Sequence, residues 1–254
     1  MPEVSIISHF YNHPDKVLEQ IAWWESLPVE ILSHVEFILV DDCSEQSPVI
    51  PATGLDLRVF RITTNIAWNQ PGARNLATFH ARGAWGLYFD LDQRFHGEPM
   101  SIVLNQIRFM DDMTLYHFRS DNEAIKDPGT RIPFHPNTYL VNIGSFKTHG
   151  MYDEDFSGSY GYDDIYMAEH WERGGGRRQL LADFNFFTNL KFDTARLDRD
   201  ASHNRRLGQQ KLLDGARNSA GMLRFAWEPV AITRAARTDR IAPNDTVDRR
   251  ILSV

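Results

Sequence analysis

The segment 85–93 constrains the fold more than any other part of the sequence, because an apolar run ends there in two carboxylates. The run is aromatic and has few polar interruptions, as is typical of a strand that helices cover on both faces of a parallel sheet. Asp90 and Asp92 follow at its carboxyl end, which is where such sheets bind their ligands. On a strand, the side-chain period of two would point both acids the same way.

Two like charges in one small volume repel each other unless a cation lies between them. A hard divalent cation such as Mg²⁺ or Mn²⁺, held by few carboxylates and completed by phosphate oxygens and water, satisfies such a pair. Asp90 and Asp92 therefore predict a metal site for a nucleoside diphosphate. Two alternatives stay open at this point. Either the acids only cap a turn, or they form the nucleophile and the general acid of a phosphatase. Residues 89–92 resemble the first motif of the haloacid dehalogenase-like phosphatases, in which two acids have these roles.

Composition narrows the class of protein. A chain of 254 residues can form one large α/β domain or two small ones. A net charge of −7 disfavours sustained binding to nucleic acid, which uses a basic face. No apolar run approaches the ~20 residues that span a bilayer, no secretion signal follows Met1, and the single cysteine cannot form an internal disulfide. We therefore expect a soluble, cytoplasmic protein.

The first half of the chain alternates short β-rich runs with helical patterns, which favours an open, doubly wound sheet. Strand, helix and strand within the first forty or so residues form a right-handed βαβ unit. The expected strands are residues 4–8, 35–40, 57–62 and 85–92, and the expected helices run from Asp15 to Pro28 and from Pro71 to about Gly83.

The second half is less regular. We expect helices over residues 102–110 and from Asp163 to the glycines at 174–176, strands over 113–118, 138–141 and 180–187, and a loop over 121–136. From residue 233 onward the sequence is rich in Arg, Asp, Pro and Thr, which predicts a loosely held tail.

Five segments, taken together and in order, resemble the nucleotide-sugar-dependent glycosyltransferases of the GT-A fold, family 2. The resemblance covers residues 4–205, and it disfavours the phosphatase because that family has no reason to carry the other four segments. The segments are residues 4–7 with Tyr11 and Asn12, residues 37–44 ending in Asp-Asp-x-Ser, Asn65 with residues 72–75, residues 88–92, and residues 144–146, 152–156 and 160–164. The loop before Gly72 is longer than in the family, and Asp-Asp at 163–164 stands where the family more often has Glu-Asp.

The resemblance implies an α/β fold of the GT-A type, Rossmann-like, with a mixed central sheet flanked by helices. It implies one domain over residues 1–232, with a nucleotide-sugar-binding half at 1–95 and an acceptor-side half at 96–232. Residues 233–254 would be the irregular C-terminal tail.

The resemblance also assigns the donor-binding residues. Asp41 or Asp42 would accept hydrogen bonds from the base or the ribose, while the other acid caps the turn. Tyr11 would stack on the base, Asn65 belongs to the donor-binding segment, and Arg74 would supply a fixed planar cation near the base or phosphates. The alternative for Arg74 is a surface salt bridge with no role in binding.

The metal ligands implied are Asp92, Asp90 and His203. Asp90 would also reach the donor, through its ribose or a water. A lone exposed histidine is the alternative for His203, and Arg205 and Arg206 next to it could close over the phosphates. Trp68, in a loop, is a candidate for sugar contact.

Asp164 is the implied general base, and Asp163 binds acceptor hydroxyls or trades roles with it. The alternative is that both acids only lie at a helix N-terminus, which favours negative charge.

The function implied is a metal-dependent, inverting, hexosyltransferase-like enzyme that uses Mn²⁺ or Mg²⁺ and a UDP-sugar, with a hydroxyl of a glycan or glycoconjugate as acceptor. The rival is a catalytically silent GT-A-like module that binds nucleotide or glycan. A nucleotidyltransferase of related architecture is a third alternative. It would need a Gly-rich basic loop after the first strand, and residues 9–14 are not such a loop, which disfavours it.

Overall fold

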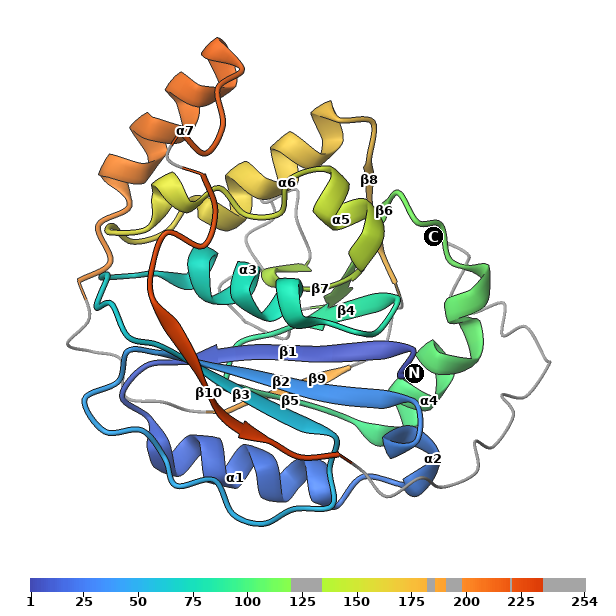
Figure 1. The fold of residues 1–254 in the computed structure, drawn as a ribbon. Helices are drawn as coiled ribbons and strands as arrows, with labels where there is room; N and C mark the ends of the chain where they lie inside the picture. The colour runs from blue at the N-terminus through green and yellow to red at the C-terminus, as the bar shows by residue number, and fades with distance from the viewer. Residues whose placement is uncertain (120–133, 182–185, 191–197, 220, 235–254) are drawn as a thin grey trace.

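The structure, a computed structural model, describes residues 1–119, 134–181, 186–190, 198–219 and 221–234. Its centre is an eight-stranded sheet in the order β10-β3-β2-β1-β4-β7-β6-β8 (Figure 1). The four strands in the middle and to one side run parallel: β1 (Val4–Phe10), β2 (Val35–Asp42), β3 (Leu57–Ile62) and β4 (Trp85–Tyr88). They are the four strands of the predicted doubly wound half.

The remaining strands make the sheet mixed, as predicted. β7 (Phe134–Asn142) runs antiparallel between β4 and β6 (Thr114–Arg119), and β8 (Arg177–Leu180) lies parallel to β6 at the edge. β10 (Trp227–Ile232) closes the other edge by pairing antiparallel with β3. β5 (Gln93–Phe95) and β9 (Phe187–Asn189) form a separate two-stranded ribbon.

Helices cover both faces of the sheet (Figure 1). One layer contains α1 (Pro14–Glu25), α2 (Val29–Leu32) and α4 (Gly97–Gln106), which η1 (Ile107–Phe109) extends. The other contains α3 (Gln70–His80), α5 (Ile143–Thr148) and α6 (Asp163–Arg173), with η3 (Glu154–Phe156) before α6 and α7 (Ser202–Asp214) packed on α6.

Each layer has its own hydrophobic core, which explains why every residue of β2 is buried. On the α1 side, Trp24 stacks on Phe37 of β2 with ring centroids 4.5 Å apart. On the α3 side, Ala73 and Ala77 present small side chains to the sheet, so the helix lies close to β1 and β2. This close approach brings the first turn of α3 to the carboxyl ends of those strands.

The acid pair lies on a turn and not on a strand, so the prediction of a strand over 85–92 was wrong at its end. β4 stops at Tyr88, and the amide of Gln93 donates to the carbonyl of Asp90 at 3.0 Å, which closes a turn before β5. Asp90 and Asp92 therefore share a small volume because of a turn, and the strand period does not apply to them.

Other boundaries differ as well. The strand expected over 180–187 is divided between the end of β8 and the start of β9, and residues 182–185 lie outside the described residues. Most of the loop expected over 121–136 also lies outside them, but residues 134–136 belong to β7. The helix expected over 102–110 begins earlier, at Gly97.

The strand β10 was not predicted, and it ties the start of the expected tail to the sheet. The amide of Thr233 donates to the carbonyl of Leu57 at 2.8 Å, and its hydroxyl donates to the carbonyl of Leu55 at 2.7 Å. Residues 235–254 lie outside the described residues, so the loosely held tail and the division into two halves stay predictions. Within the described ranges, no helix is both long enough and apolar enough to cross a bilayer.

Candidate functional site

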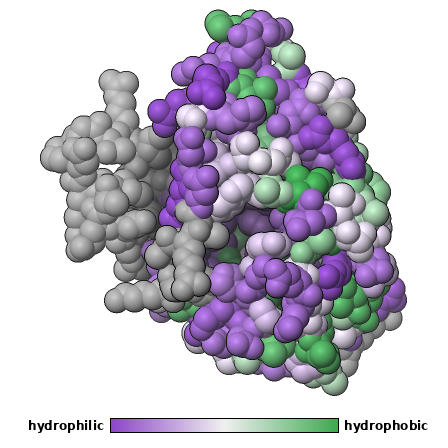
Figure 2. Space-filling view, turned by 90° about the vertical axis from the view of Figure 1, so that its left-hand side faces the viewer, coloured by the Kyte–Doolittle hydropathy of each residue, from purple (hydrophilic) through white to green (hydrophobic). Residues whose placement is uncertain are grey.

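The carboxyl ends of β1, β2 and β4 reach the same edge of the sheet, on the left-hand side of Figure 1, where α3 and α6 begin. Figure 2 looks onto this side and shows a hollow near its centre, bordered by hydrophilic residues together with residues of intermediate and higher hydropathy. Ligands of open α/β sheets bind at such an edge. We therefore expect the predicted site residues to meet at this edge.

Arg74, on α3, holds the first acid of the pair after β4. Its guanidinium is buried and donates to Asp90 Oδ1 and to the hydroxyl of Tyr152, both at 2.8 Å. Asn137 Nδ2, from β7, donates to the other oxygen of Asp90 at 3.3 Å. Arg74 is thus a buried structural cation of the cleft, and not a surface salt bridge.

Asn69, the residue before α3, holds the acid at the end of β2. Its Nδ2 donates to Asp42 Oδ1 at 3.1 Å, and its Oδ1 accepts from the hydroxyl of Ser157 at 2.8 Å. Asn65, the residue assigned by resemblance, is exposed in the loop four residues earlier. The asparagine that meets Asp42 is therefore Asn69.

Gln70, the first residue of α3, reaches the acid pair of α6. Its Nε2 donates to Asp163 Oδ2 at 2.9 Å and to Asn137 Oδ1 at 3.1 Å. Since Asn137 also donates to Asp90, two amide side chains join Asp163 to Asp90. The acids of the second half of the chain therefore face those of the first half across the start of α3.

Asp41 and Asp42 have different surroundings, although they are neighbours at the end of β2. Asp41 is 0% exposed, accepts from the amide of Ser44 at 2.8 Å and from the hydroxyl of Ser47, and lies 3.8 Å from Arg61. Asp41 caps the turn after β2. Burial, with a smaller contribution from Asp41, raises the pKa of Asp42 to about 7.

The acid pair at the start of α6 is buried, and no Lys or Arg side chain in the described part of the chain forms an ion pair with it. Burial and the charge of Asp164 raise the pKa of Asp163 to about 7, and burial raises the pKa of Asp164. Asp164 Oδ1 accepts from the amide of Ile165 at 2.7 Å. Among the described residues, no group donates to its other oxygen, so that oxygen can accept a proton from a ligand.

The turn after β4 suits a divalent cation. Burial, followed by the charge of Asp90, raises the pKa of Asp92 to about 6, so a cation between the two carboxylates would stabilise both. The described residues contain no group of three His, Cys, Asp or Glu side chains that could hold a metal. Asp90 and Asp92 fit an ion that takes most of its ligands from phosphate and water.

α7 carries the remaining candidates on an exposed surface. His203, Arg205 and Arg206 are exposed, whereas Asn204 between them is buried. Asn204 Nδ2 donates to the carbonyls of residues 156, 159 and 161 at 2.9, 2.8 and 2.8 Å, and so anchors α7 to the loop before α6. Metal binding by His203 stays a prediction.

Two aromatic candidates lie in loops near the strand ends. Tyr11, just after β1, is 44% exposed, as a ring that stacks on a ligand would be. Trp68, half-buried in the loop before α3, lies edge-on to Tyr160 with ring centroids 4.8 Å apart. Its role in sugar contact stays a prediction.

Sequence reasoning missed Asn69, Gln70 and Asn137, whose amides connect the acids. The first two precede Pro71, a residue that marks a helix start, so the polar first turn of α3 was a readable signal. Asn137 lies in β7, more than forty residues from Asp90, and no local pattern indicates it.

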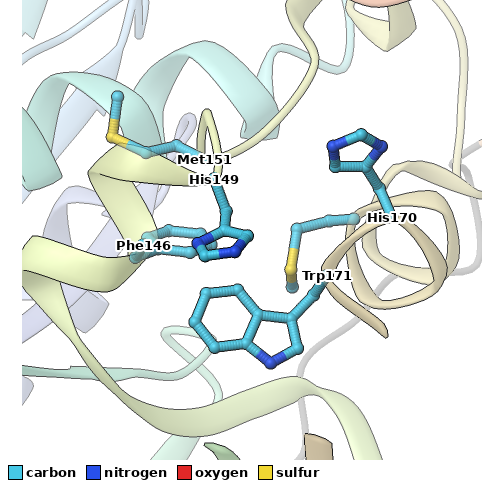
Figure 3. A pocket seen from close by; sticks show the side chains of 6 residues that line it. Phe146, His149, Met151, His170 and Trp171 are labelled. Carbon is cyan, nitrogen blue, oxygen red and sulfur yellow. The ribbon is translucent and has the colours of Figure 1, made fainter. Parts of the chain in front are cut away.

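A separate pocket lies between α5 and α6, away from these acids (Figure 3). Burial lowers the pKa of His170 there to about 4, and His149 lies against the Trp171 ring with centroids 4.8 Å apart. None of the acids above lines this pocket, so we do not assign it to the site. The lining residues are Phe146, His149, Met151, Met167, His170 and Trp171.

Comparison with known proteins gives a family match. The family model described as "Glycosyl transferase family 2" matches residues 5–164, a stretch that begins in β1 and ends at Asp164. No curated protein matches the chain.

Solved structures share the fold at low identity. S. aureus TarS 1-349 in complex with UDP-GlcNAc matches with a TM-score of 0.62 and 18% identity, over 86% of this chain and 69% of that one. The structure described as S. aureus TarS 1-349 matches with a TM-score of 0.56 and 18% identity, over 75% and 60%. The mannosyltransferase PcManGT from Pyrobaculum calidifontis, in complex with GDP-Man and Mn²⁺, matches with a TM-score of 0.53 and 18% identity, over 84% and 62%.

These likenesses confirm the predicted GT-A fold class. The chain spans 60% and 62% of the length of two of these structures, which are correspondingly longer.

Proposed function

The chain belongs to glycosyl transferase family 2, and from that premise we propose that it transfers a sugar from a nucleoside-diphosphate sugar to an acceptor hydroxyl, with inversion at the anomeric carbon. One observation carries the proposal. Three side chains at the start of α3 each donate to a different acid of the cleft: Asn69 to Asp42, Gln70 to Asp163 and Arg74 to Asp90. These three bonds support our proposal that donor-side and acceptor-side acids line one cleft.

The donor would lie across the ends of β2, β1 and β4. Asp42 would accept hydrogen bonds from the base, and the exposed ring of Tyr11 would stack on it. Arg74, which fixes Asp90, would supply positive charge near the diphosphate. We propose a UDP-sugar as donor; the neighbouring TarS structure with UDP-GlcNAc supports this choice.

Asp90 and Asp92 would hold Mn²⁺ or Mg²⁺ together with the diphosphate. Burial, and after it the charge of Asp90, raises the pKa of Asp92; this raised pKa supports the metal role, as does the Mn²⁺ in the PcManGT complex. When bound, the ion supplies electrostatic stabilisation of the charge that grows on the leaving diphosphate.

Asp164 would act as general base. Its Oδ1 is held by the amide of Ile165, which leaves Oδ2 for the acceptor, whereas Asp163 is already bonded to Gln70. The acceptor hydroxyl would give its proton to Asp164 as its oxygen bonds the anomeric carbon, and the bond from that carbon to the diphosphate breaks. A single displacement of this kind inverts the anomeric carbon. We propose a glycan or glycoconjugate as the acceptor.

The proposal is tested by incubating the protein with Mn²⁺ and a panel of UDP-sugars and GDP-sugars, and measuring release of the nucleoside diphosphate. We expect release from at least one UDP-sugar, with water or an added glycan as acceptor. Asp164→Asn should reduce release at least a hundredfold and leave UDP affinity within about twofold. Release at the wild-type rate by Asp164→Asn would remove Asp164 from the reaction, and no release from any donor would count against the transferase.

A further inference from the structure

The helix α7, which packs on α6 (Figure 1), is attached to the rest of the molecule by a polar stripe. Its buried residues are Asn204, Gly208 and Lys211, and their spacing of four and three places them on one face of the helix. Surface helices usually pack through an apolar stripe. An amide, a glycine and an ammonium group make directed contacts instead, so the contacts identify which segment α7 holds.

Asn204 holds the chain just before the acid pair of α6. Its Nδ2 donates to the carbonyls of residues 156, 159 and 161 at 2.9, 2.8 and 2.8 Å, so the two hydrogens of one amide serve three acceptors. Buried backbone carbonyls are nearly always paired, and losing their donor costs free energy. The side chain of Asn204 therefore keeps residues 156–161 in the path that brings these three oxygens together.

The turn that follows has two residues in the left-handed region. Gly161 has a φ of 72°, and Tyr162, the residue before α6, has a φ of 67°. Glycine adopts this region readily, but for a bulky residue it is strained and persists only where the surroundings hold it. α7 supplies that support on both sides: Asn204 binds the carbonyl of Gly161, and the Tyr162 ring packs so closely on Gly208 that a Cβ there would collide with it.

The conformation of this turn decides where the acids of α6 lie. Asp163 and Asp164 follow Tyr162 directly as the first two residues of the helix, and both are buried. A rotation of the backbone at residues 161–162 would move both carboxylates together, and would take Asp163 away from Gln70. The family match ends at Asp164, so it assigns no role to α7.

We propose that Asn204 is a positioning residue, which holds the turn at residues 161–162 and thereby places Asp163 and Asp164 for the reaction. The inference rests on the proposed function, because it takes the role of the two acids from there. Asn204 is 1% exposed, so it acts through the backbone and not by contact with a substrate. A helix outside the family match thus becomes part of what the reaction needs.

The test compares Asn204→Leu with the wild type in the full-length protein. Hydrogen–deuterium exchange of residues 156–166 reports how often this segment opens, and it needs no turnover. Release of UDP from the panel of UDP-sugars with Mn²⁺ gives kcat and KM, and calorimetry gives the affinity for UDP. Gly208→Ala is a second variant, because its methyl group would displace the Tyr162 ring while Asn204 is kept.

Two further variants are the matched controls, and thermal unfolding shows that every variant is folded. Gln209→Leu makes a similar change on the exposed face of the same helix. Ile21→Val removes one buried methyl group from α1, in the other layer of helices. It shows whether a general loss of stability is enough to lower the rate.

For Asn204→Leu and Gly208→Ala we expect faster exchange in residues 156–166 and a kcat lowered about ten- to a hundredfold, because small displacements of catalytic groups have large effects on rate. KM and UDP affinity should stay within about threefold of the wild type, and both controls should keep the wild-type kcat. Unchanged exchange or an unchanged kcat for Asn204→Leu would overturn the positioning role, as would an equal loss of kcat in Ile21→Val. If the wild type releases UDP from no UDP-sugar, the proposed function is wrong, and the exchange measurement still decides whether Asn204 holds the turn.

Discussion

Gln70 and Asp163, which are 93 residues apart in the sequence, are joined by a hydrogen bond of 2.9 Å from Nε2 to Oδ2. The bond crosses from α3 to α6, and so from the half of the chain expected to bind the donor to the half expected to bind the acceptor. Asn137 continues the connection from Gln70 to Asp90. Asp163 and Asp90 are thus held in place relative to each other before any ligand binds.

Replacing Gln70 should separate acceptor-side chemistry from donor binding. Gln70→Leu has similar size but cannot donate to Asp163 or Asn137, so both would lose a fixed neighbour. We expect the rate of UDP release from a UDP-sugar to fall about ten- to a hundredfold, because small displacements of catalytic groups have large effects on rate. UDP affinity should change by less than about threefold. Gln209→Leu, on the exposed surface of α7, is the control, and equal rates for the two variants would remove Gln70 from this role.

Lys211 should be among the larger contributors to stability on this side of the molecule. It is buried on α7 and lies 3.1 Å from Asp153 and 2.6 Å from Asp155. Lys211→Met removes the cation beside Asp153 and leaves Asp155 with Arg224 alone, which we expect to cost about 3 kcal/mol of the free energy of unfolding. In a protein of this size the melting temperature would fall by about 6–12 °C.

An exposed pair gives the matched control for Lys211. Lys16 lies 2.8 Å from Glu19 on α1, and both side chains are more than one third exposed. Lys16→Met should change the free energy of unfolding by less than about 1 kcal/mol, since solvent screens such pairs. Urea unfolding measures both variants, and equal effects would contradict the structural role of Lys211.

Asp42 should make stability depend on pH. Its pKa is about 7 in the folded protein and near 3.8 when unfolded, so the folded state binds the extra proton between these values. Wild-type stability due to this group therefore falls as pH rises from about 4 to 7. Asp42→Asn removes that loss, and we expect it to stabilise the protein by on the order of 2 kcal/mol at pH 8 and by nearly nothing at pH 4.

The measurement for Asp42 is urea unfolding of both proteins at several pH values between 4 and 8.5. Taking the difference between variant and wild type cancels the histidines of lowered pKa, such as His117, whose effect on stability has the opposite sign in this range. A difference that is constant with pH would contradict the raised pKa.

The sequence was sufficient for the four parallel strands of the sheet and for the acids at their ends. Apolar runs that end in Asp42 and just before Asp90 predicted parallel strands with ligand-facing ends, because burial on both faces leaves a local signature. The strand β10 was missed because it is stabilised by pairing with β3, far earlier in the chain, and has little local pattern of its own. The predicted strand that corresponds to β4 was too long, because nothing in Phe89 or Leu91 shows where the chain turns.

The sequence singled out the acids that the cleft contains, but not the network of side chains that joins them. Asp163 and Asp164 stood out because two acids open a helix, whereas Gln70 and Asn137 are ordinary amides until the fold places them between those acids. Asn65 was assigned to donor binding by resemblance, and that role stays a prediction; the asparagine that holds Asp42 is Asn69, which the sequence reasoning did not single out. Contacts between residues distant in sequence carry no local signal.

The most direct test of the donor site is a calorimetric titration of the protein with UDP, with and without Mn²⁺. The wild type should bind UDP at least tenfold more tightly with Mn²⁺ than in EDTA, because Asp90 and Asp92 need a cation between them and the diphosphate. Asp92→Asn should lose most of that difference and remain folded. UDP affinity that is the same with Mn²⁺ and with EDTA, or no binding of UDP at all, would contradict the account.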